Sequence, residues 1–250
     1  MTDGVLNVVL GLVASAISAG LGWLAQTLRR RRRLERERAF FGLPADGEAL
    51  LVSNRHAGTT DPKSVARDDV YALMELAALV RECGARTVLT SHDEVRQGLG
   101  DKTEFCVGGP DGNERTAAHL ASWLPGAAFV APPDAAGHPV RTLLVGDREF
   151  AFRTSAEQPG GTAYALLARV HLRPGSRPVF LIAGQTAVSN HAAVRYLAAH
   201  HRSLARRHGP EGAFAVVLRV VNARAYGPDV VEFEADVTAE ATTRPQPADA

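Results

Sequence analysis

The stretch TEFCVGGPDGNERTAAHL, residues 103–120, joins a short apolar run to a helical pattern through two glycines, a proline and an asparagine. The apolar run, Phe105 to Val107, is typical of a buried strand, and Asn113 is a favoured residue at a helix N-cap. Gly108 and Gly109 allow positive φ and the close approach of other atoms to the backbone. The stretch therefore predicts a strand–turn–helix unit, the building block of α/β folds.

Similar units lie on both sides of this stretch. Helical patterns fall at 65–84, 93–99, 113–124 and 189–207, and strand patterns at 49–54, 86–90, 105–107, 128–131, 140–152, 163–172, 178–183, 213–221 and 230–237. Strands that alternate with helices predict parallel βαβ units, whereas the segments after Pro132 look like hairpins. We expect an α/β fold: a Rossmann-like mixed sheet with helices on it and a β-rich insertion before the last strand–helix–strand unit. Two domains divided near Pro132 are the alternative.

Composition narrows the class of protein. Hydrophobic residues make up 46% of the 250 residues and charged residues 22%, which is typical of a folded globular chain. The formal charge of +1 argues against a general nucleic-acid binder, which usually carries a basic excess. Cys83 and Cys106 lie far apart in apolar surroundings, so we expect two reduced, buried thiols of a cytosolic domain rather than a disulfide.

The N-terminal segment combines an uncharged stretch with a basic run. Residues 4–28 carry no charged side chain, and arginines follow from Arg29 to Arg33. A cleaved signal peptide places its basic residues before the apolar region, and a buried core helix rarely ends in a basic run. A transmembrane anchor explains both features, and the positive-inside bias places the rest of the chain in the cytoplasm. The sequence therefore predicts a single-pass protein of the cell membrane, whose arginines flank the span or also contact anionic head groups.

The expected organisation has four parts. Phe40 and Phe41 need apolar surroundings, so the linker that contains them is expected to dock on the domain, and the polar, proline-bearing tail is expected to be disordered. The parts are an anchor with its arginine-rich flank (1–38), a linker (39–47), a cytoplasmic α/β domain (48–239) and a tail (240–250).

The first candidate ligand site follows the strand at 105–107. In open α/β sheets, ligands bind beyond the carboxyl ends of the strands. Backbone amides at the start of the next helix attract anions, and side-chain donors can add to them. The residues proposed for this role are Gly108, Gly109, Asn113, Arg115 and Thr116. An ordinary strand–helix connection uses the same residue types, and that interpretation stays open here.

The second candidate site follows the apolar run at 178–183. Gly184 ends this strand, and Ser189 or Asn190 is expected to cap the next helix. Arg55 and Asp61 follow the strand at 49–54 and are expected near the same edge of the sheet. Neither glycine turn has the G-x-G-x-x-G or G-x-x-x-x-G-K-[ST] spacing of a specific nucleotide site.

Signs of catalysis are sparse. The chain has no G-x-S-x-G, H-x-x-x-H or H-E-x-x-H pattern, so no metal site and no activated serine is predicted, and no cofactor is indicated. Cys106 lies inside an apolar run and is expected to be an inert thiol. His56 and Asp61 are the residues that a hydrolase could use as acid or base.

With the anchor, the GGPDGN turn and the LIAGQTAVSNHAAVRYL unit placed, the chain resembles a group of uncharacterised bacterial proteins. Those proteins combine a membrane anchor with a Rossmann-like domain that carries a G-G-P-x-x-N turn and a later strand–Gly–helix unit. The resemblance covers roughly residues 45–221 and implies a fold and a ligand crevice, with no settled activity. Many such units place Gly-Thr before the last helix, where this chain has Ser189-Asn190, so a phosphate-binding role of that turn does not carry over.

Three functions are compatible with these patterns. The first is a membrane-tethered cytoplasmic domain that binds or senses a nucleotide-like anionic small molecule. The second is a hydrolase of nucleotides or nucleosides on the same scaffold. The third is a protein-binding scaffold without a ligand.

Overall fold

The computed structural model describes residues 2–56, 58–61, 63–95, 99–153 and 161–244, and within the first helix it describes side chains at residue 10 and from residue 17 onward. The helices are α1 (Thr2–Phe41), α2 (Arg67–Glu82), α3 (Glu114–Trp123), α4 (Ala187–His208), α5 (Ala223–Tyr226) and α6 (Thr238–Thr242). The strands are β1 (Glu48–Ser53), β2 (Arg86–Ser91), β3 (Thr103–Val107), β4 (Ala127–Val130), β5 (Thr142–Val145), β6 (Arg148–Ala151), β7 (Thr162–His171), β8 (Pro178–Gly184), β9 (Phe214–Val221) and β10 (Val231–Asp236).

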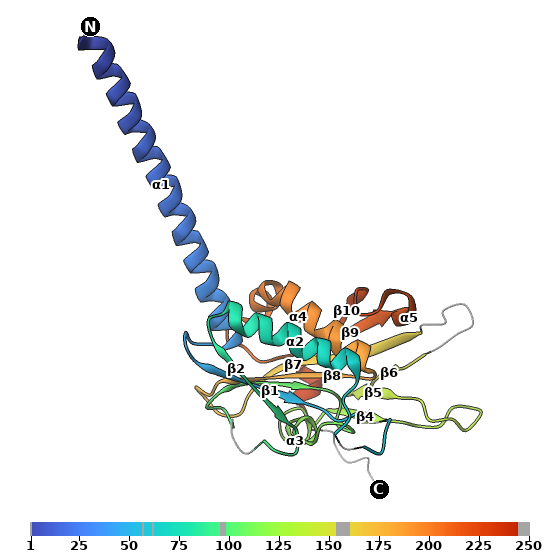
Figure 1. The fold of residues 1–250 in the computed structure, drawn as a ribbon. Coiled ribbons are helices and arrows are strands. Elements are labelled where there is room, and N and C mark those ends of the chain that lie inside the picture. Colours follow the sequence, from blue (N-terminus) through green and yellow to red (C-terminus); the bar gives the residue numbers. More distant parts are fainter. Residues whose placement is uncertain (1, 57, 62, 96–98, 154–160, 245–250) are drawn as a thin grey trace.

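The main sheet has seven strands in the order β10-β9-β7-β8-β3-β1-β2 (Figure 1). Strands β8, β3, β1 and β2 are parallel, whereas β7, β9 and β10 continue the sheet with antiparallel pairs. The predicted α/β class with a mixed sheet is confirmed. The order also means that the chain leaves β1 toward β2 on one side and returns through β3 on the other, which makes the space between the ends of β1 and β3 a topological switch point.

Helices cover both faces of this sheet (Figure 1). On one face, α2 and α4 pack against each other and against residues such as Leu51, Phe105 and Ile182. On the other face, α3 and α6 bury Leu120 and Ala241 against the neighbouring side chains of the same strands. Because β3 and β8 are enclosed on both faces, each contains an uninterrupted apolar run, Phe105 to Val107 in β3 and Val179 to Ala183 in β8.

The β-rich segment differs from the expected single sheet. Strands β4, β5 and β6 form a separate three-stranded antiparallel sheet, and Leu143, Val145 and Phe150 pack it under the main sheet. Of the strands between Pro132 and Pro178, only β7 joins the main sheet. Short strands joined by tight turns pair most readily with their neighbours in sequence, which accounts for the separate sheet.

The end of α1 is inserted into the core, as the sequence predicts for the two phenylalanines. Phe40 and Phe41 are buried and their rings lie 4.9 Å apart. Arg169 of β7, itself fully buried, places its guanidinium 4.4 Å from the centre of the Phe40 ring and donates to the carbonyls of Phe40, Pro210 and Gly209. Burial lowers the pKa of Arg169 to about 10. This buried arginine therefore fastens α1 to the sheet, and no pattern in the sequence predicted it.

The helix α1 continues through the predicted arginine-rich flank and projects away from the sheet (Figure 1). In the part of the chain that the structure describes, no helix has both the length and the apolar character that crossing a bilayer requires. The structure therefore does not support the predicted anchor; of the expected span, residues 4–28, the side chains of residues 4–9 and 11–16 lie outside the described part.

Two smaller segments also differ from expectation. Of the helix predicted at 93–99, residues 93, 94 and 99 lie in turns, residue 95 has no regular structure, and residues 96–98 lie outside the described part. Residues 238–242, which reach into the predicted disordered tail, form α6, and the carbonyl of Ala241 accepts the Gly126 amide.

Candidate functional site

Three strand ends meet at one edge of the main sheet. The parallel strands β1, β3 and β8 end at Ser53, Val107 and Gly184, so the segments that follow them lie side by side. A Cβ added to Gly109 would lie 3.3 Å from the carbonyl oxygen of Gly184. The two glycine turns that the sequence singles out therefore converge at the switch point of the sheet.

A buried carboxylate ties these ends together. Asp69, in the first turn of α2, is 1% exposed. Its Oδ2 accepts from Asn54 Nδ2 at 2.9 Å, and its Oδ1 accepts from Asn190 Nδ2 at 2.7 Å. Asn190 Oδ1 in turn accepts the backbone amide of Gly184 at 2.6 Å. One hydrogen-bonded chain thus links β1, α2, α4 and β8.

The burial of the Asp69 carboxylate has an electrostatic cost. Burial raises the pKa of the Asp69 carboxyl, and the hydrogen bonds from Asn190 and Asn54 act in the opposite direction. Both carboxyl oxygens accept amide hydrogens, which is the bonding pattern of the ionised form. The two asparagines are thus placed to stabilise this buried charge.

The glycines of the GGPDGN turn are explained by packing. Gly108 has φ +104°, and a Cβ there would lie 2.6 Å from the Asn54 Cβ. A Cβ on Gly112 would lie 2.7 Å from the carbonyl oxygen of Arg55. The backbone amide of Arg55 in turn donates to the carbonyl oxygen of Gly112. The tight-connection interpretation of this turn therefore holds, and it places the loop after β3 directly on the loop after β1.

A cavity of about 180 Å³ remains between these loops. Its lining comes from the segments after β1, β3 and β8, from the start of α2 and from β4 and β5. Four of the residues proposed from the sequence line it: Arg55, Gly109, Gly184 and Asn190. The volume is smaller than the roughly 300 Å³ at the low end of pockets for drug-sized ligands.

Two buried polar atoms near the cavity have no hydrogen-bond partner among the described residues: Asn54 Oδ1 and His56 Nδ1. Asn54 is 8% exposed and lines the cavity, as does His56. Because Nδ2 of Asn54 must face the Asp69 carboxylate, Oδ1 is the atom left without a donor. A buried acceptor of this kind costs free energy unless a ligand or water supplies a donor.

Charges of both signs line the cavity. Arg55 is exposed at its mouth and donates to the Asp111 carbonyl, and Arg141 of the small sheet donates to the Gln185 carbonyl. Asp69 and Asp111 balance them in formal charge. Gln185 is buried and donates to the carbonyls of Arg141 and Phe150, so it holds the small sheet against this edge of the main sheet.

The other proposed residues have structural partners. Asn113 caps α3, as predicted: its Oδ1 accepts the Thr116 amide and its Nδ2 donates to the Val107 carbonyl. The cap of α4 is Thr186, with Ser189 completing a capping box, so the prediction of Ser189 or Asn190 at that cap was wrong by a few residues. Gly108, Asn113, Arg115, Thr116, Ser189 and Asp61 are not among the lining residues of the cavity, and Asp61 is exposed.

Arg115 points to a buried carboxylate on β3. Its Nε and Nη2 donate to the two oxygens of Glu104, and His119 Nε2 lies 3.0 Å from Glu104 Oε1. Cys106 Sγ also lies 3.1 Å from that oxygen. Glu104, Cys106 and His119 form the one cluster of potential metal ligands within the described residues. Because the Arg115 guanidinium donates to both carboxylate oxygens of Glu104, Glu104 and Arg115 form a buried ion pair.

Both thiols match their expected state. Cys83 and Cys106 are free and buried. Burial raises the pKa of Cys83 to about 12 and the pKa of Cys106 well above its ordinary value. Neither thiol has the low pKa of a nucleophile.

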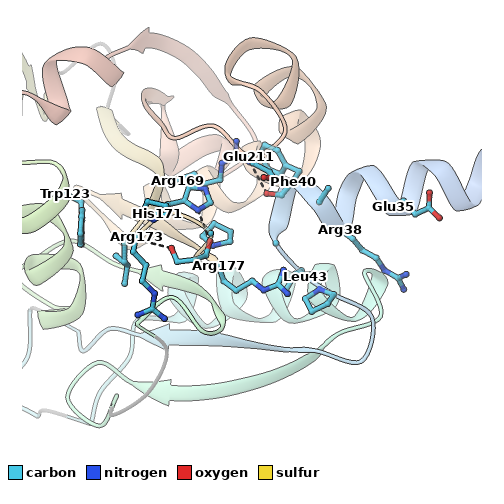
Figure 2. A pocket seen from close by; sticks show the side chains of 18 residues that line it. Glu35, Arg38, Phe40, Leu43, Trp123, Arg169, His171, Arg173, Arg177 and Glu211 are labelled. Atoms are coloured by element: carbon cyan, nitrogen blue, oxygen red, sulfur yellow. Dashed lines mark hydrogen bonds between the residues drawn. The ribbon is translucent and has the colours of Figure 1, made fainter.

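A larger cavity, of about 790 Å³, lies at the opposite edge of the main sheet, near the end of α1 (Figure 2). Three of its arginines have partners: Arg169 bonds to backbone carbonyls, Arg38 donates to the Cys83 carbonyl, and Arg173 pairs with Asp101. Size favours this cavity, and His171 Nε2, which belongs to its lining, also has no partner among the described residues. The carboxyl ends of three parallel strands favour the smaller one.

Three residues of the smaller site were not predicted from the sequence. Asn54 is the last residue of the strand predicted at 49–54, Asp69 has the sequence position of an ordinary acidic residue in the first turn of a helix, and Arg141 lies in a distant hairpin. For Asp69, the signal available was its position in the first turn after the loop that follows β1.

Comparison of the chain with protein-family models, with curated proteins and with solved structures found no match.

Proposed function

We propose that this mixed α/β protein binds the sugar-phosphate part of a nucleotide-like small molecule in the cavity beyond β1, β3 and β8. The observation that carries the proposal is the buried, unpartnered Oδ1 of Asn54 beside a cavity at the switch point of the sheet. The parallel strands with helices on both faces support the Rossmann-like description of this half of the fold.

The lining indicates the chemistry of the ligand. Asn54 Oδ1 requires a donor such as a sugar hydroxyl, and Arg55 at the mouth offers a guanidinium to an anion. A cavity of about 180 Å³ holds a sugar-phosphate but not a whole nucleotide. A base would then lie outside it, next to Phe129 of β4, which also lines the opening.

Thermal-shift and calorimetric titration of the full chain test this proposal with ribose 5-phosphate, AMP, ribose and adenosine as probes. The phosphorylated probes are expected to bind more tightly than the unphosphorylated ones. Arg55→Gln is expected to remove that preference, whereas the matched control Arg86→Gln, at the opposite edge of the sheet, is expected to keep it. No binding of either phosphorylated probe to folded protein, or equal effects of the two substitutions, would count against the proposal.

The hydrolase alternative has one observation in its favour: His56 lines the cavity with Nδ1 unpartnered. Asp61, the other candidate for acid–base chemistry, is exposed and accepts the amide of Lys63 instead. Release of inorganic phosphate from AMP during incubation, lost in His56→Ala, would favour hydrolysis over binding alone.

A further inference from the structure

A third cavity, of about 760 Å³, lies between the C-terminal part of α1 and the C-terminal half of α4. Arginines dominate its lining: Arg29, Arg32, Arg33 and Arg36 come from α1, and Arg202 and Arg206 come from α4. Glu37 supplies the one carboxylate among the described lining residues, and His201 lies 3.8 Å from it. A chain with a net charge of +1 thus gathers a strong local excess of positive charge at this arginine cleft.

The spacing of the arginines explains the cleft. Residues three, four and seven positions apart share one face of a helix, which is the spacing on α1, and the two arginines of α4 are four residues apart. In the described part of the chain, none of the six forms an ion pair, and Arg206 donates to Ser203 Oγ. Two rows of arginines therefore line the cleft, and Glu37 is the one carboxylate among the described residues of the lining.

Such an arrangement favours a bound anion. Like charges that face each other across a cleft repel, and a phosphate between them replaces repulsion with attraction. The planar guanidinium also matches the geometry of phosphate oxygens and forms paired hydrogen bonds with them.

The neighbouring part of α1 indicates the source of the phosphate. Ile17, Leu21, Trp23, Leu24 and Leu28 are all exposed, Trp23 by 70%. An exposed apolar helix that runs directly into arginines matches the boundary of a lipid layer, where apolar side chains enter the interface and arginines meet the head groups. The helix also leaves the domain on the face that α4 covers (Figure 1). A nucleic acid would use the arginines but leave these apolar side chains in water.

We propose that the arginine cleft binds the phosphate head groups of an anionic phospholipid surface. Residues 17–28 of α1 lie against the apolar boundary of that surface. The contact is one of surface attachment and is independent of the cavity assigned to the sugar-phosphate.

Co-sedimentation of the full chain with vesicles tests this proposal. One set contains phosphatidylcholine alone and the other also contains phosphatidylglycerol. Wild-type protein is expected to prefer the anionic vesicles, and Arg202→Gln/Arg206→Gln is expected to weaken that binding by roughly thirtyfold, because each arginine near an anionic surface contributes about 1 kcal/mol. The matched control Arg148→Gln/Arg224→Gln removes the same charge from exposed positions in β6 and α5, outside α1 and the cleft, and is expected to keep most of the preference.

Three results would overturn the proposal. Equal binding to both kinds of vesicle would show that head-group charge is not recognised. Equal losses in the two double variants would show general surface charge rather than a cleft. Tight binding of inorganic tripolyphosphate or of a DNA duplex, lost in Arg202→Gln/Arg206→Gln and without a preference for anionic vesicles, would assign the cleft to a soluble anion.

Discussion

Replacement of Glu104 by glutamine tests how α3 is held beneath the candidate site. Glu104 is fully buried on β3 and its oxygens accept from Arg115 at 2.7 and 2.9 Å and from His119 at 3.0 Å. Burial alone would raise its pKa, but the bonds from Arg115 and His119 prevail and lower it from 4.5 to about 2. A displacement of this size corresponds to about 3 kcal/mol of stability, since one pH unit is worth about 1.4 kcal/mol.

The sign of the effect follows from the direction of the shift. A carboxyl whose pKa is lower in the folded state stabilises the fold above its unfolded pKa of 4.5, and this stability is lost as the pH falls toward 2. We expect Glu104→Gln to lower the free energy of unfolding by about 3 kcal/mol at pH 7, because Arg115 loses its buried anion. The difference from wild type should shrink to about 1.5 kcal/mol at pH 3, because Glu104 is then largely protonated in the unfolded chain, so that folding requires the loss of a proton. Glutamine does not titrate, so the stability of the variant lacks this dependence on pH.

Urea unfolding followed by circular dichroism at pH 7, 5 and 3 measures this difference. Glu48→Gln serves as the control, because Glu48 is partly exposed and pairs with Lys102 at the surface. The control is expected to show a much smaller change at every pH. A difference between wild type and Glu104→Gln that stays constant from pH 7 to pH 3 would refute the assignment of the buried ion pair.

Three further predictions concern the neighbourhood of the cavity. Asp69→Asn is expected to rotate the Asn54 side-chain amide, so that its Nδ2 donor takes the place of the free Oδ1 acceptor at the cavity. The affinity for ribose 5-phosphate should then fall roughly tenfold in calorimetric titration, and an unchanged affinity would contradict this prediction. Gly108→Ala should lower the free energy of unfolding by about 2 kcal/mol because of its φ of +104°, whereas Gly109→Ala should cost less than about 1 kcal/mol; equal losses in urea unfolding would contradict this. Cys106 is expected to react with iodoacetamide at pH 8 only after unfolding, because burial raises its pKa, and mass spectrometry of native protein that shows the adduct would disprove it.

Much of the fold was predictable because local patterns carry it. The helix over 67–82 stops where Gly84 takes φ +76°, close to the predicted stop, and Asn113 caps α3 as expected. The separate sheet of β4 to β6 was not predictable, because short alternating strands do not encode which partner they choose. Whether the uncharged N-terminal stretch spans a membrane stays a prediction that fractionation of the full chain can test.

The candidate site was predictable only in outline. Glycines after strands placed the turns at 108 and 184 at one edge, since parallel strands end on the same side of a sheet. The residues that make the cavity polar, Asn54, Asp69 and Arg141, lie in segments with no local signal for binding. Arg115, which the sequence proposed for a ligand, instead pairs with Glu104 on β3, four residues before Gly108.

By itself, the sequence determined the approximate positions of most strands and helices, because periodicity, glycine and capping residues act over a few neighbouring positions. The tertiary structure alone decided which side chains meet. The carboxylate of Asp69 finds two amides, one of them 121 positions away along the chain, and six arginines from α1 and α4 come to face one another. Contacts of this kind arise from strand order and helix packing, which depend on the burial of the whole apolar surface rather than on any single segment.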